Sequence, residues 1–234
     1  MKPETVRLLT WNIHGTLGRN PRFDPGRVVD LISKWKPDVI ALQEVDSRRK
    51  LPNCADPFAQ LQEALGQHGV SARSITTEDG HYGQMLISCC PMHDCEVVDI
   101  SAPEREPRRA IKAEIDAPAG KVRVIATHLG LSLGERRSQT RKLLALAGDP
   151  SLTTIVLGDF NDWLWAGSVR SMLARELPGR TRFRTFPSFA PLLRLDRIFC
   201  RPAYALRASF TDAGARGISD HLPVIADVAP LPEP

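Results

Sequence analysis

Apolar runs that end in a polar side chain recur along this chain and constrain its fold more than any other feature. Residues 39–43 lead to Glu44, residues 153–157 lead to GDFND at 158–162, and the tripeptide SDH occupies 219–221. Such runs are typical of strands buried within a sheet. Functional groups are often carried just beyond strand ends, on segments held by a rigid scaffold. The sequence therefore predicts an α/β domain whose acidic and polar groups gather at a sheet edge.

Strand-like and helix-like segments follow one another along most of the chain. Each of two Asp-Pro pairs, at 24–25 and 56–57, provides an N-cap and a first-turn proline for a helix. The first helix is expected to end before Pro37 and the second near Gly66 or Gly69. Short connections favour antiparallel neighbours, so we expect two sheets packed face to face with helices outside. Strands are expected at 6–12, 39–43, 70–76, 82–88, 95–100, 110–115, 122–128, 153–157, 195–200, 207–210 and 224–228, and further helices at 135–147 and 168–176.

Length and composition fit one enzyme-sized domain. The 234 residues, 42% of them hydrophobic, can supply a substantial core. We expect a single domain over 1–228 and a proline-rich tail at 229–234 with nothing to pack. The net charge of +4, from 31 basic and 27 acidic residues, excludes a dedicated DNA-coating protein but permits a phosphate-bearing substrate. Eight arginines within 175–207 form either solvated surface or a positive face beside the active site.

The cysteines and the N-terminal segment set the expected compartment. The five cysteines form no CxxC pair, and an odd number in a chain this long argues against a disulfide scaffold. Reduced, mostly buried thiols are expected. The first strand follows no apolar segment of signal-peptide length, and no run of about 18 apolar residues occurs. We expect a soluble, cytoplasmic protein, with peripheral attachment to a membrane as the alternative.

Six polar residues at predicted strand ends form the candidate site. Taken singly, each has a structural alternative: Asn12 closes a turn, Glu44 caps a helix, or His128 is a hydrogen-bonded core histidine. Six such coincidences together favour an active site. The six residues are Asn12, Glu44, His128, Asp159, Asp220 and His221.

These residue types meet the requirements of phosphodiester hydrolysis. The reaction needs charge neutralisation on the non-bridging oxygens, an activated water and stabilisation of the departing alkoxide. Carboxylates that hold a hard divalent cation supply the first, and Mg²⁺ prefers oxygen ligands while keeping several waters. The sequence has no HExxH or clustered-cysteine zinc pattern. Glu44 is the leading candidate ligand and Asp220 the second.

His221 and Asp196 form the candidate pair for general base catalysis. A carboxylate beside a histidine fixes its tautomer and supports the imidazolium that forms when the ring takes a proton. Asp196 lies in the otherwise apolar segment 192–199, where burying an acid is costly unless it is paired. The alternative partner for this acid is Arg194 or Arg197.

Seven motifs, spread over nearly the whole chain, contain these residues. In this order they resemble the motifs of the endonuclease/exonuclease/phosphatase superfamily. The resemblance implies the DNase I-like fold, a four-layer α/β/β/α sandwich with two mixed, mostly antiparallel sheets. It also implies an enzyme that hydrolyses phosphate esters with Mg²⁺ or Mn²⁺. The motifs are TWNIHG (10–15), LQEVD (42–46), YGQMLIS (82–88), THLG (127–130), GDFND (158–162), LDRIF (195–199) and SDHLPV (219–224).

The resemblance implies a metal and phosphate centre built from four residues. Glu44 binds the metal, and Asp220 lies near it. Asn12 and Asn161 hold the phosphate or a water of the metal, which makes Asn12 a further candidate ligand. Members of the superfamily differ on whether one or two metals are used.

The resemblance also implies the groups that move protons and contact the phosphate. Asp159 orients or deprotonates the attacking water, and His221 works with Asp196. Relatives differ on whether the aspartate or the histidine takes the proton. His128 contacts the phosphoryl group or assists the leaving oxygen. Arg109 falls where relatives place a phosphate contact, with surface exposure as the alternative.

Two positions depart from the pattern of the superfamily. His14 stands where some nuclease relatives carry an aspartate, which removes a potential second metal ligand and favours a single ion. The strand at 82–88 offers no carboxylate to orient His128, and Gln84 is the candidate for that role.

Aromatic residues near the site form a candidate substrate lip. Trp163 and Trp165 follow GDFND, and Phe186 and Phe189 precede LDRIF. This part of the chain resembles a bacterial branch of the superfamily that often accompanies cardiolipin-synthase-type enzymes. A hydrophobic lip suits a base or a lipid headgroup, with Trp163 as the leading substrate contact; alternatively, these side chains cover the edge of the core.

Three functions remain open at this point. The chain is a nuclease, a phosphodiesterase or phosphatase acting on a phospholipid or small phosphate ester, or a non-catalytic scaffold. A nuclease requires a continuous basic groove, whereas a lipid or small-ester hydrolase requires a narrower, partly apolar pocket. The scaffold is disfavoured because competent residues occupy the catalytic positions. We expect a phosphate-ester substrate, no stable protein partner and a monomer.

Overall fold

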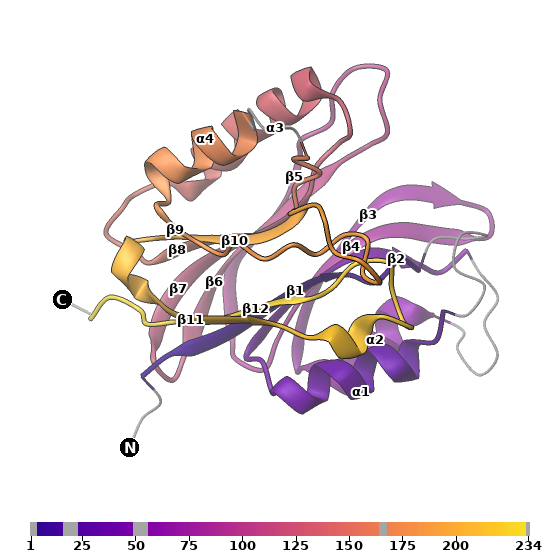
Figure 1. The fold of residues 1–234 in the computed structure, drawn as a ribbon, viewed down its shortest axis with the longest axis horizontal. Helices are drawn as coiled ribbons and strands as arrows, with labels where there is room; N and C mark the ends of the chain where they lie inside the picture. Colours follow the sequence, from indigo (N-terminus) through magenta and orange to yellow (C-terminus); the bar gives the residue numbers. More distant parts are fainter. Residues whose placement is uncertain (1–3, 16–22, 49–55, 164–167, 233–234) are drawn as a thin grey trace.

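The computed structural model describes residues 4–15, 23–48, 56–163 and 168–232, which form two sheets between two layers of helices (Figure 1). Each sheet has six strands. The first has the order β11 (Leu206–Thr211), β12 (Val224–Val228), β1 (Val6–Asn12), β2 (Val39–Asp46), β4 (Gly80–Ser88), β3 (His68–Thr77). The second has the order β5 (Met92–Asp99), β6 (Arg109–Ala117), β7 (Gly120–His128), β8 (Thr154–Asp159), β10 (Asp196–Arg201), β9 (Gly179–Arg180).

Four α-helices cover the outer faces of the sheets. The helices α1 (Pro25–Trp35) and α2 (Pro57–Leu65) lie on the first sheet, while α3 (Leu133–Ala147) and α4 (Ser168–Glu176) lie on the second. Short 3₁₀ turns, η1 (Ala203–Ala205) and η2 (Ala213–Ala215), flank β11. This arrangement confirms the predicted four-layer α/β/β/α sandwich.

Each sheet contains one parallel pair, and these pairs position the site. The strands β1 and β2 are parallel and connected through α1, and β7 and β8 are parallel and connected through α3. The other ladders between described strands are antiparallel. A parallel pair joined by a crossover helix brings two carboxyl ends to the same sheet edge. Each sheet therefore delivers two adjacent strand ends to the site.

Three apolar layers hold the sandwich together. The central layer lies between the sheets and includes Leu8, Leu86 and Val124. The outer layers lie beneath α1 and α2 on one side and beneath α3 and α4 on the other. The strand residues alternate between the central layer and an outer layer, as strand geometry requires.

Helix starts follow the local signals in the sequence. Asp24 and Asp56 accept hydrogen bonds from the Gly26 and Phe58 backbone N–H groups, which satisfies otherwise unpaired donors. Ser132 and Glu135 form a capping box at the start of α3.

The structure departs from the predicted elements at two places. The short strand β9 was not predicted, and its pairing with β10 extends the second sheet. The tail expected to have nothing to pack instead contacts the body: the N–H of Ala229 donates to the Ala205 carbonyl, and the N–H of Leu231 donates to Thr153 Oγ1. Among the described helices, none is both long and apolar enough to cross a membrane.

Candidate active site

The first half of the site comes from β1 and β2. Their ladder pairs Asn12 with Gln43, so both strand ends reach the same edge. The ladder between β2 and β4 is then interrupted between Gln43 and Val45. The extra residue is Glu44, which has a left-handed φ of 59° and a carbonyl that accepts the Gly15 N–H. Bulges re-aim side chains beside active sites, and this one delivers Glu44 to the pocket.

The second half comes from β7 and β8, whose ladder pairs His128 with Asp159. Close approach of these strands depends on Gly158, which has a φ of +147° and where a Cβ would lie 1.9 Å from the Thr127 carbonyl oxygen. Glycine is therefore required there. Next along the chain, the backbone N–H of Asn161 donates to Oδ1 of Asp159 at 2.9 Å, which fixes the carboxylate.

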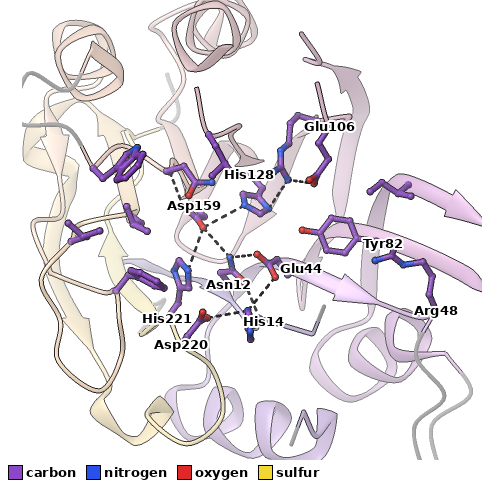
Figure 2. A pocket seen from close by; sticks show the side chains of 18 residues that line it. Asn12, His14, Glu44, Arg48, Tyr82, Glu106, His128, Asp159, Asp220 and His221 are labelled. Atoms are coloured by element: carbon purple, nitrogen blue, oxygen red, sulfur yellow. Dashed lines mark hydrogen bonds and ion pairs between the residues drawn. The ribbon is translucent and has the colours of Figure 1, made fainter. Parts of the chain in front are cut away.

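Three side chains converge on the other oxygen of Asp159 (Figure 2). Its Oδ2 lies 3.0 Å from Nδ2 of Asn12, 3.6 Å from Nε2 of His128 and 3.9 Å from Nε2 of His221. Burial, with the nearby charge of Asp196, raises the pKa of Asp159 to about 6. Asp159 is thus a buried carboxylate shared by an amide and two imidazoles.

His221 contacts the buried acid that the sequence paired with it. Its Nδ1 lies 2.8 Å from Oδ2 of Asp196, which is opposite Asp159 in the ladder of β10 and β8. An ionised carboxylate only accepts hydrogen bonds, so Nδ1 carries a proton and Nε2 is directed toward Asp159. Burial lowers the pKa of His221, but Asp196 and Asp159 outweigh it and raise this pKa to about 10.

His128 has a cation as its neighbour. Nη1 of Arg108 lies 3.3 Å from Nδ1 of His128 and 3.1 Å from Oε1 of Glu106. A guanidinium only donates, so Nδ1 of His128 accepts and the ring proton resides on Nε2, toward Asp159. Burial and the charge of Arg108 lower the pKa of His128 well below its usual value. His128 is therefore a neutral N–H donor.

Arg109 and Gln84 do not occupy the positions expected from the sequence. The guanidinium of Arg109 pairs with Asp99, and Nε2 of Gln84 donates to the Arg109 carbonyl at 2.5 Å. Neither residue lines the pocket that contains Asp159, whereas Arg108 does. Successive residues of an extended segment point to opposite sides, so the prediction chose the wrong one of two adjacent arginines. The adjacent pair Arg108–Arg109 was the sequence signal that could have identified Arg108 as a pocket residue.

Glu44 and Asp220 reach one common point. Nδ1 of His14 lies 3.5 Å from Oε2 of Glu44 and 3.3 Å from Oδ1 of Asp220. The hydrogen bond with Glu44, supported by the charge of Asp220, raises the pKa of His14 against the opposing effect of burial. Two carboxylates directed at one imidazole provide the hard oxygen donors that Mg²⁺ or Mn²⁺ prefers.

The two asparagines offer different groups to the pocket. Oδ1 of Asn12 accepts the His14 N–H at 3.0 Å, and its Nδ2 lies 3.1 Å from Oε1 of Glu44. In this orientation Asn12 is a donor between two carboxylates, and metal ligation requires Oδ1 to leave its present partner. Nδ2 of Asn161 donates to the Leu129 carbonyl at 2.8 Å, so this amide offers an acceptor to the pocket.

These groups line a cavity of about 470 Å³ whose lining is partly apolar and partly polar. The apolar lining residues include Leu131, Trp163 and Phe186. Phe186 packs against the imidazole of His221 with ring centroids 4.9 Å apart. Trp163 is 55% exposed and stands at the rim, as the lip hypothesis expected. Phe189 is exposed but does not line the cavity, and Trp165 lies outside the described residues.

The polar part of the lining was not predicted from the sequence. It includes Tyr82, Arg48 and Glu106, which Figure 2 labels, together with Arg108. The guanidinium of Arg48 is bound by both oxygens of Asp46 and lies 5.2 Å from the centroid of the Tyr82 ring. Tyr82 begins the YGQMLIS motif, and this place in the motif was the available signal.

Comparison with known proteins agrees with this site and fold. Residues 9–221 match the model of the endonuclease/exonuclease/phosphatase family. The chain belongs to this family. The uncharacterized protein YbhP of Escherichia coli K12 is 30% identical over 247 residues, covering 96% of each chain. The resemblance recognised in the sequence is thereby confirmed at the level of the family.

Solved structures in the family share the fold at low sequence identity. An endonuclease/exonuclease/phosphatase protein from Beutenbergia cavernae superposes with a TM-score of 0.76 at 23% identity, covering 97% of this chain and 72% of that one. A mannosyl-6-phosphatase from Bacteroides thetaiotaomicron superposes with a TM-score of 0.70 at 15% identity, covering 94% and 98%. Family membership indicates a hydrolase of phosphate esters.

Proposed function

We propose that the chain is a Mg²⁺- or Mn²⁺-dependent phosphodiesterase whose substrate is a phospholipid or a small organic phosphodiester. The observation that carries the proposal is the convergence of Asn12, His128 and His221 on the buried carboxylate of Asp159. This arrangement supplies a proton acceptor for a water and donors for the charge that develops on the phosphoryl oxygens. The named phosphatase among the structural neighbours supports phosphate-ester chemistry.

Glu44 and Asp220 fit the role of metal ligands. Their carboxylate oxygens approach the same imidazole nitrogen, so both acids face one part of the pocket and would hold the cation together. The bound ion would neutralise charge on the phosphate oxygens. The donor set contains oxygen and no thiolate, which favours a hard cation. Addition of EDTA should therefore abolish turnover, and Mg²⁺ or Mn²⁺ should restore it.

The chain's own groups divide the proton work around Asp159. Asp159, whose pKa of about 6 leaves it ionised near neutral pH, accepts a proton of the attacking water. His221, charged at that pH and held in place by Asp196, presents its Nε2–H beside Asp159. His128 presents its Nε2–H to a phosphoryl or leaving oxygen. Asn161 contributes an acceptor suited to holding the water. These assignments require no movement of the buried histidines.

The cavity walls favour a small or lipid-like organic group over duplex nucleic acid. Cavities of about 300–1,000 Å³ suit small ligands. In this cavity the apolar lining residue Phe186 packs against the catalytic residue His221. The two arginines among the described lining residues, Arg48 and Arg108, are both paired with acids. None of the eight arginines within 175–207 is among those lining residues. The described lining residues therefore do not form the continuous basic groove that nuclease binding requires.

A metal-dependent substrate screen tests the proposal. The purified chain is assayed with bis(4-nitrophenyl) phosphate, 4-nitrophenyl phosphate, phosphatidyl vesicles, inositol phosphates, and single- and double-stranded DNA, with Mg²⁺, Mn²⁺ or EDTA. Asp159→Asn serves as the blank, and Asp149→Asn, which changes an exposed acid in the turn before β8, is the matched control.

The two parts of the proposal fail in different ways. We expect diester cleavage that requires the metal, disappears in Asp159→Asn and persists in Asp149→Asn. Equal activity in wild type and Asp159→Asn contradicts the assigned chemistry. Cleavage of DNA alone, with the same dependence on metal and Asp159, keeps the chemistry and overturns the substrate class.

A further inference from the structure

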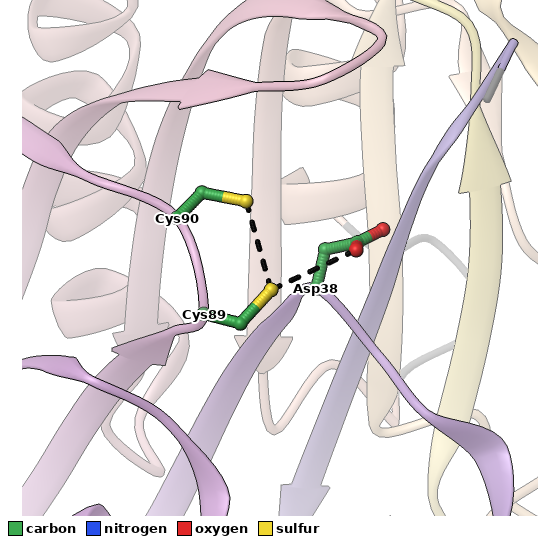
Figure 3. A group of neighbouring side chains, drawn as sticks. All are labelled: Asp38, Cys89 and Cys90. Atoms are coloured by element: carbon green, nitrogen blue, oxygen red, sulfur yellow. Dashed lines mark hydrogen bonds between the residues drawn. The ribbon is translucent and has the colours of Figure 1, made fainter. Parts of the chain in front are cut away.

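Two adjacent cysteines and an aspartate form a second cluster of potential ligands (Figure 3). Sγ of Cys89 lies 3.6 Å from Sγ of Cys90 and 3.8 Å from Oδ1 of Asp38. All three donor atoms lie within 4.8 Å of one another. Both cysteines are free. The catalytic groups play no part in this cluster.

The backbone holds the three residues together beyond paired strand ends. Val39 of β2 is opposite Ser88 of β4, so Asp38 and Cys89 meet just outside the ladder. The N–H of Cys89 donates to the Asp38 carbonyl at 3.0 Å. Tyr82 lines the catalytic pocket at the other end of β4, and at about 3.3 Å per residue the cluster is roughly 20 Å away along the strand.

We propose that Cys89, Cys90 and Asp38 bind a soft divalent cation such as Zn²⁺ or Cd²⁺. With Zn–S bonds of about 2.3 Å and Zn–O bonds of about 2.0 Å, a tetrahedral site has edges of roughly 3.8 Å between sulfurs and roughly 3.5 Å between sulfur and oxygen. The two shortest distances in the cluster match these edges within a few tenths of an ångström. Cys89 is exposed while Cys90 is buried, so solvent can reach the ion and supply the fourth ligand.

The ligand chemistry separates this site from the catalytic one. Thiolates select Zn²⁺ and Cd²⁺, whereas carboxylates and waters suit Mg²⁺ and Mn²⁺. Burial raises the pKa of Cys89 to about 12 and also raises that of Cys90, so the empty site holds protonated thiols. Binding requires both thiols to lose their protons to solvent.

Cadmium titration of the full-length chain tests the site without any assay of activity. Cd²⁺ is titrated into the protein in a buffer that contains a phosphine reductant, and the ultraviolet thiolate-to-cadmium charge-transfer band is recorded. We expect saturation at one ion per chain and loss of this band in both Cys89→Ser and Cys90→Ser. Asp38→Asn replaces the carboxylate ligand by an amide and should weaken binding by roughly tenfold or more, because loss of even a group that only supports a ligand costs about 10–100-fold.

Matched variants separate this cluster from other metal-binding groups. Cys95→Ser changes an exposed cysteine outside the cluster and should leave the band unchanged. Glu44→Gln, which alters the catalytic carboxylates, should also leave it unchanged. Circular dichroism and thermal unfolding establish that each variant is folded. An unchanged band in folded Cys89→Ser and Cys90→Ser, or no saturable band in wild type, overturns the proposal.

Discussion

Two of the histidines that line the pocket, His128 and His221, lie on different sides of Asp159, and their Nδ1 atoms have opposite roles. Nδ1 of His221 donates to a carboxylate, Asp196, whereas Nδ1 of His128 accepts from a guanidinium, Arg108. Both Nε2 atoms are directed at Oδ2 of Asp159. The two histidines therefore use the same ring atom in opposite hydrogen-bonding roles, as a donor in His221 and as an acceptor in His128.

This difference shows that the neighbour of a histidine, and not the histidine itself, determines what it offers a substrate. The carboxylate raises the pKa of His221 despite its burial, while the cation adds to the effect of burial and lowers the pKa of His128. His128 keeps a proton on Nε2 without carrying a charge. His221, with a pKa of about 10, already carries a second proton near neutral pH and can donate it from Nε2.

The largest expected effect comes from removing His221. His221→Ala should lower kcat by about 10²–10⁴, the range typical of a general acid–base group. Steady-state kinetics with the diester identified in the substrate screen measure the change, and circular dichroism checks the fold. His128→Ala is the matched comparison and should lower kcat less, because it removes a neutral donor. A larger loss of kcat for His128→Ala than for His221→Ala contradicts the assignment of the larger catalytic contribution to His221.

Asp196→Asn should narrow the difference in pKa between His128 and His221, because Asp196 is the largest of the groups that raise the pKa of His221. An unfolded histidine has a pKa of about 6.5, whereas that of folded His221 is about 10. Charged His221 therefore stabilises the native state fully below about pH 6.5, and this contribution is lost as the pH rises through about 10. In the metal-free wild type, the free energy of unfolding should fall across this range. The decline should be shallower in Asp196→Asn; equal slopes contradict the pairing.

Arg108→Met should change His128 while leaving His221 unaffected. Loss of the cation raises the pKa of His128 and frees its tautomer, and we expect kcat to fall by about tenfold, within the lower range for a positioned donor. Arg108→Lys, which keeps the charge, should recover part of the loss. Titration of the His128 ring by NMR distinguishes this role from general destabilisation. If the titration of His128 is unchanged in folded Arg108→Met, Arg108 does not control the pKa of His128.

The smallest effect is expected for Arg109→Met, the matched control for Arg108. Its guanidinium pairs with Asp99 outside the pocket, so kcat/KM should stay within about twofold, as expected for a surface pair of small energetic value. A loss comparable to that of Arg108→Met restores the phosphate contact first predicted for Arg109.

Much of this molecule could be predicted because its signals are local. Asp24 and Asp56 mark the helix starts, and apolar runs mark the strands that end at Asn12 and Asp159. The pairing of His221 with Asp196 followed from the cost of burying an unpaired acid.

The remaining features depend on geometry that a linear pattern does not contain. Arg108 reaches the pocket because successive side chains of an extended segment point to opposite sides, and a bulge turns Glu44 toward the pocket. Asn12 directs its amide nitrogen at two carboxylates because its oxygen is bound to a backbone N–H. Each outcome follows from a contact between segments distant in sequence or from a local backbone turn.

The most direct test is the protonation of the four imidazole nitrogens of His128 and His221 near neutral pH. Long-range ¹H–¹⁵N NMR on the metal-free protein, assigned with His128→Ala and His221→Ala, reports each nitrogen separately. We predict protons on both ring nitrogens of His221, whose pKa is about 10, and in His128 an unprotonated Nδ1 with a proton on Nε2. A proton on Nδ1 of His128, or an unprotonated Nδ1 in His221, contradicts the opposite hydrogen-bonding roles on which the proposed chemistry depends.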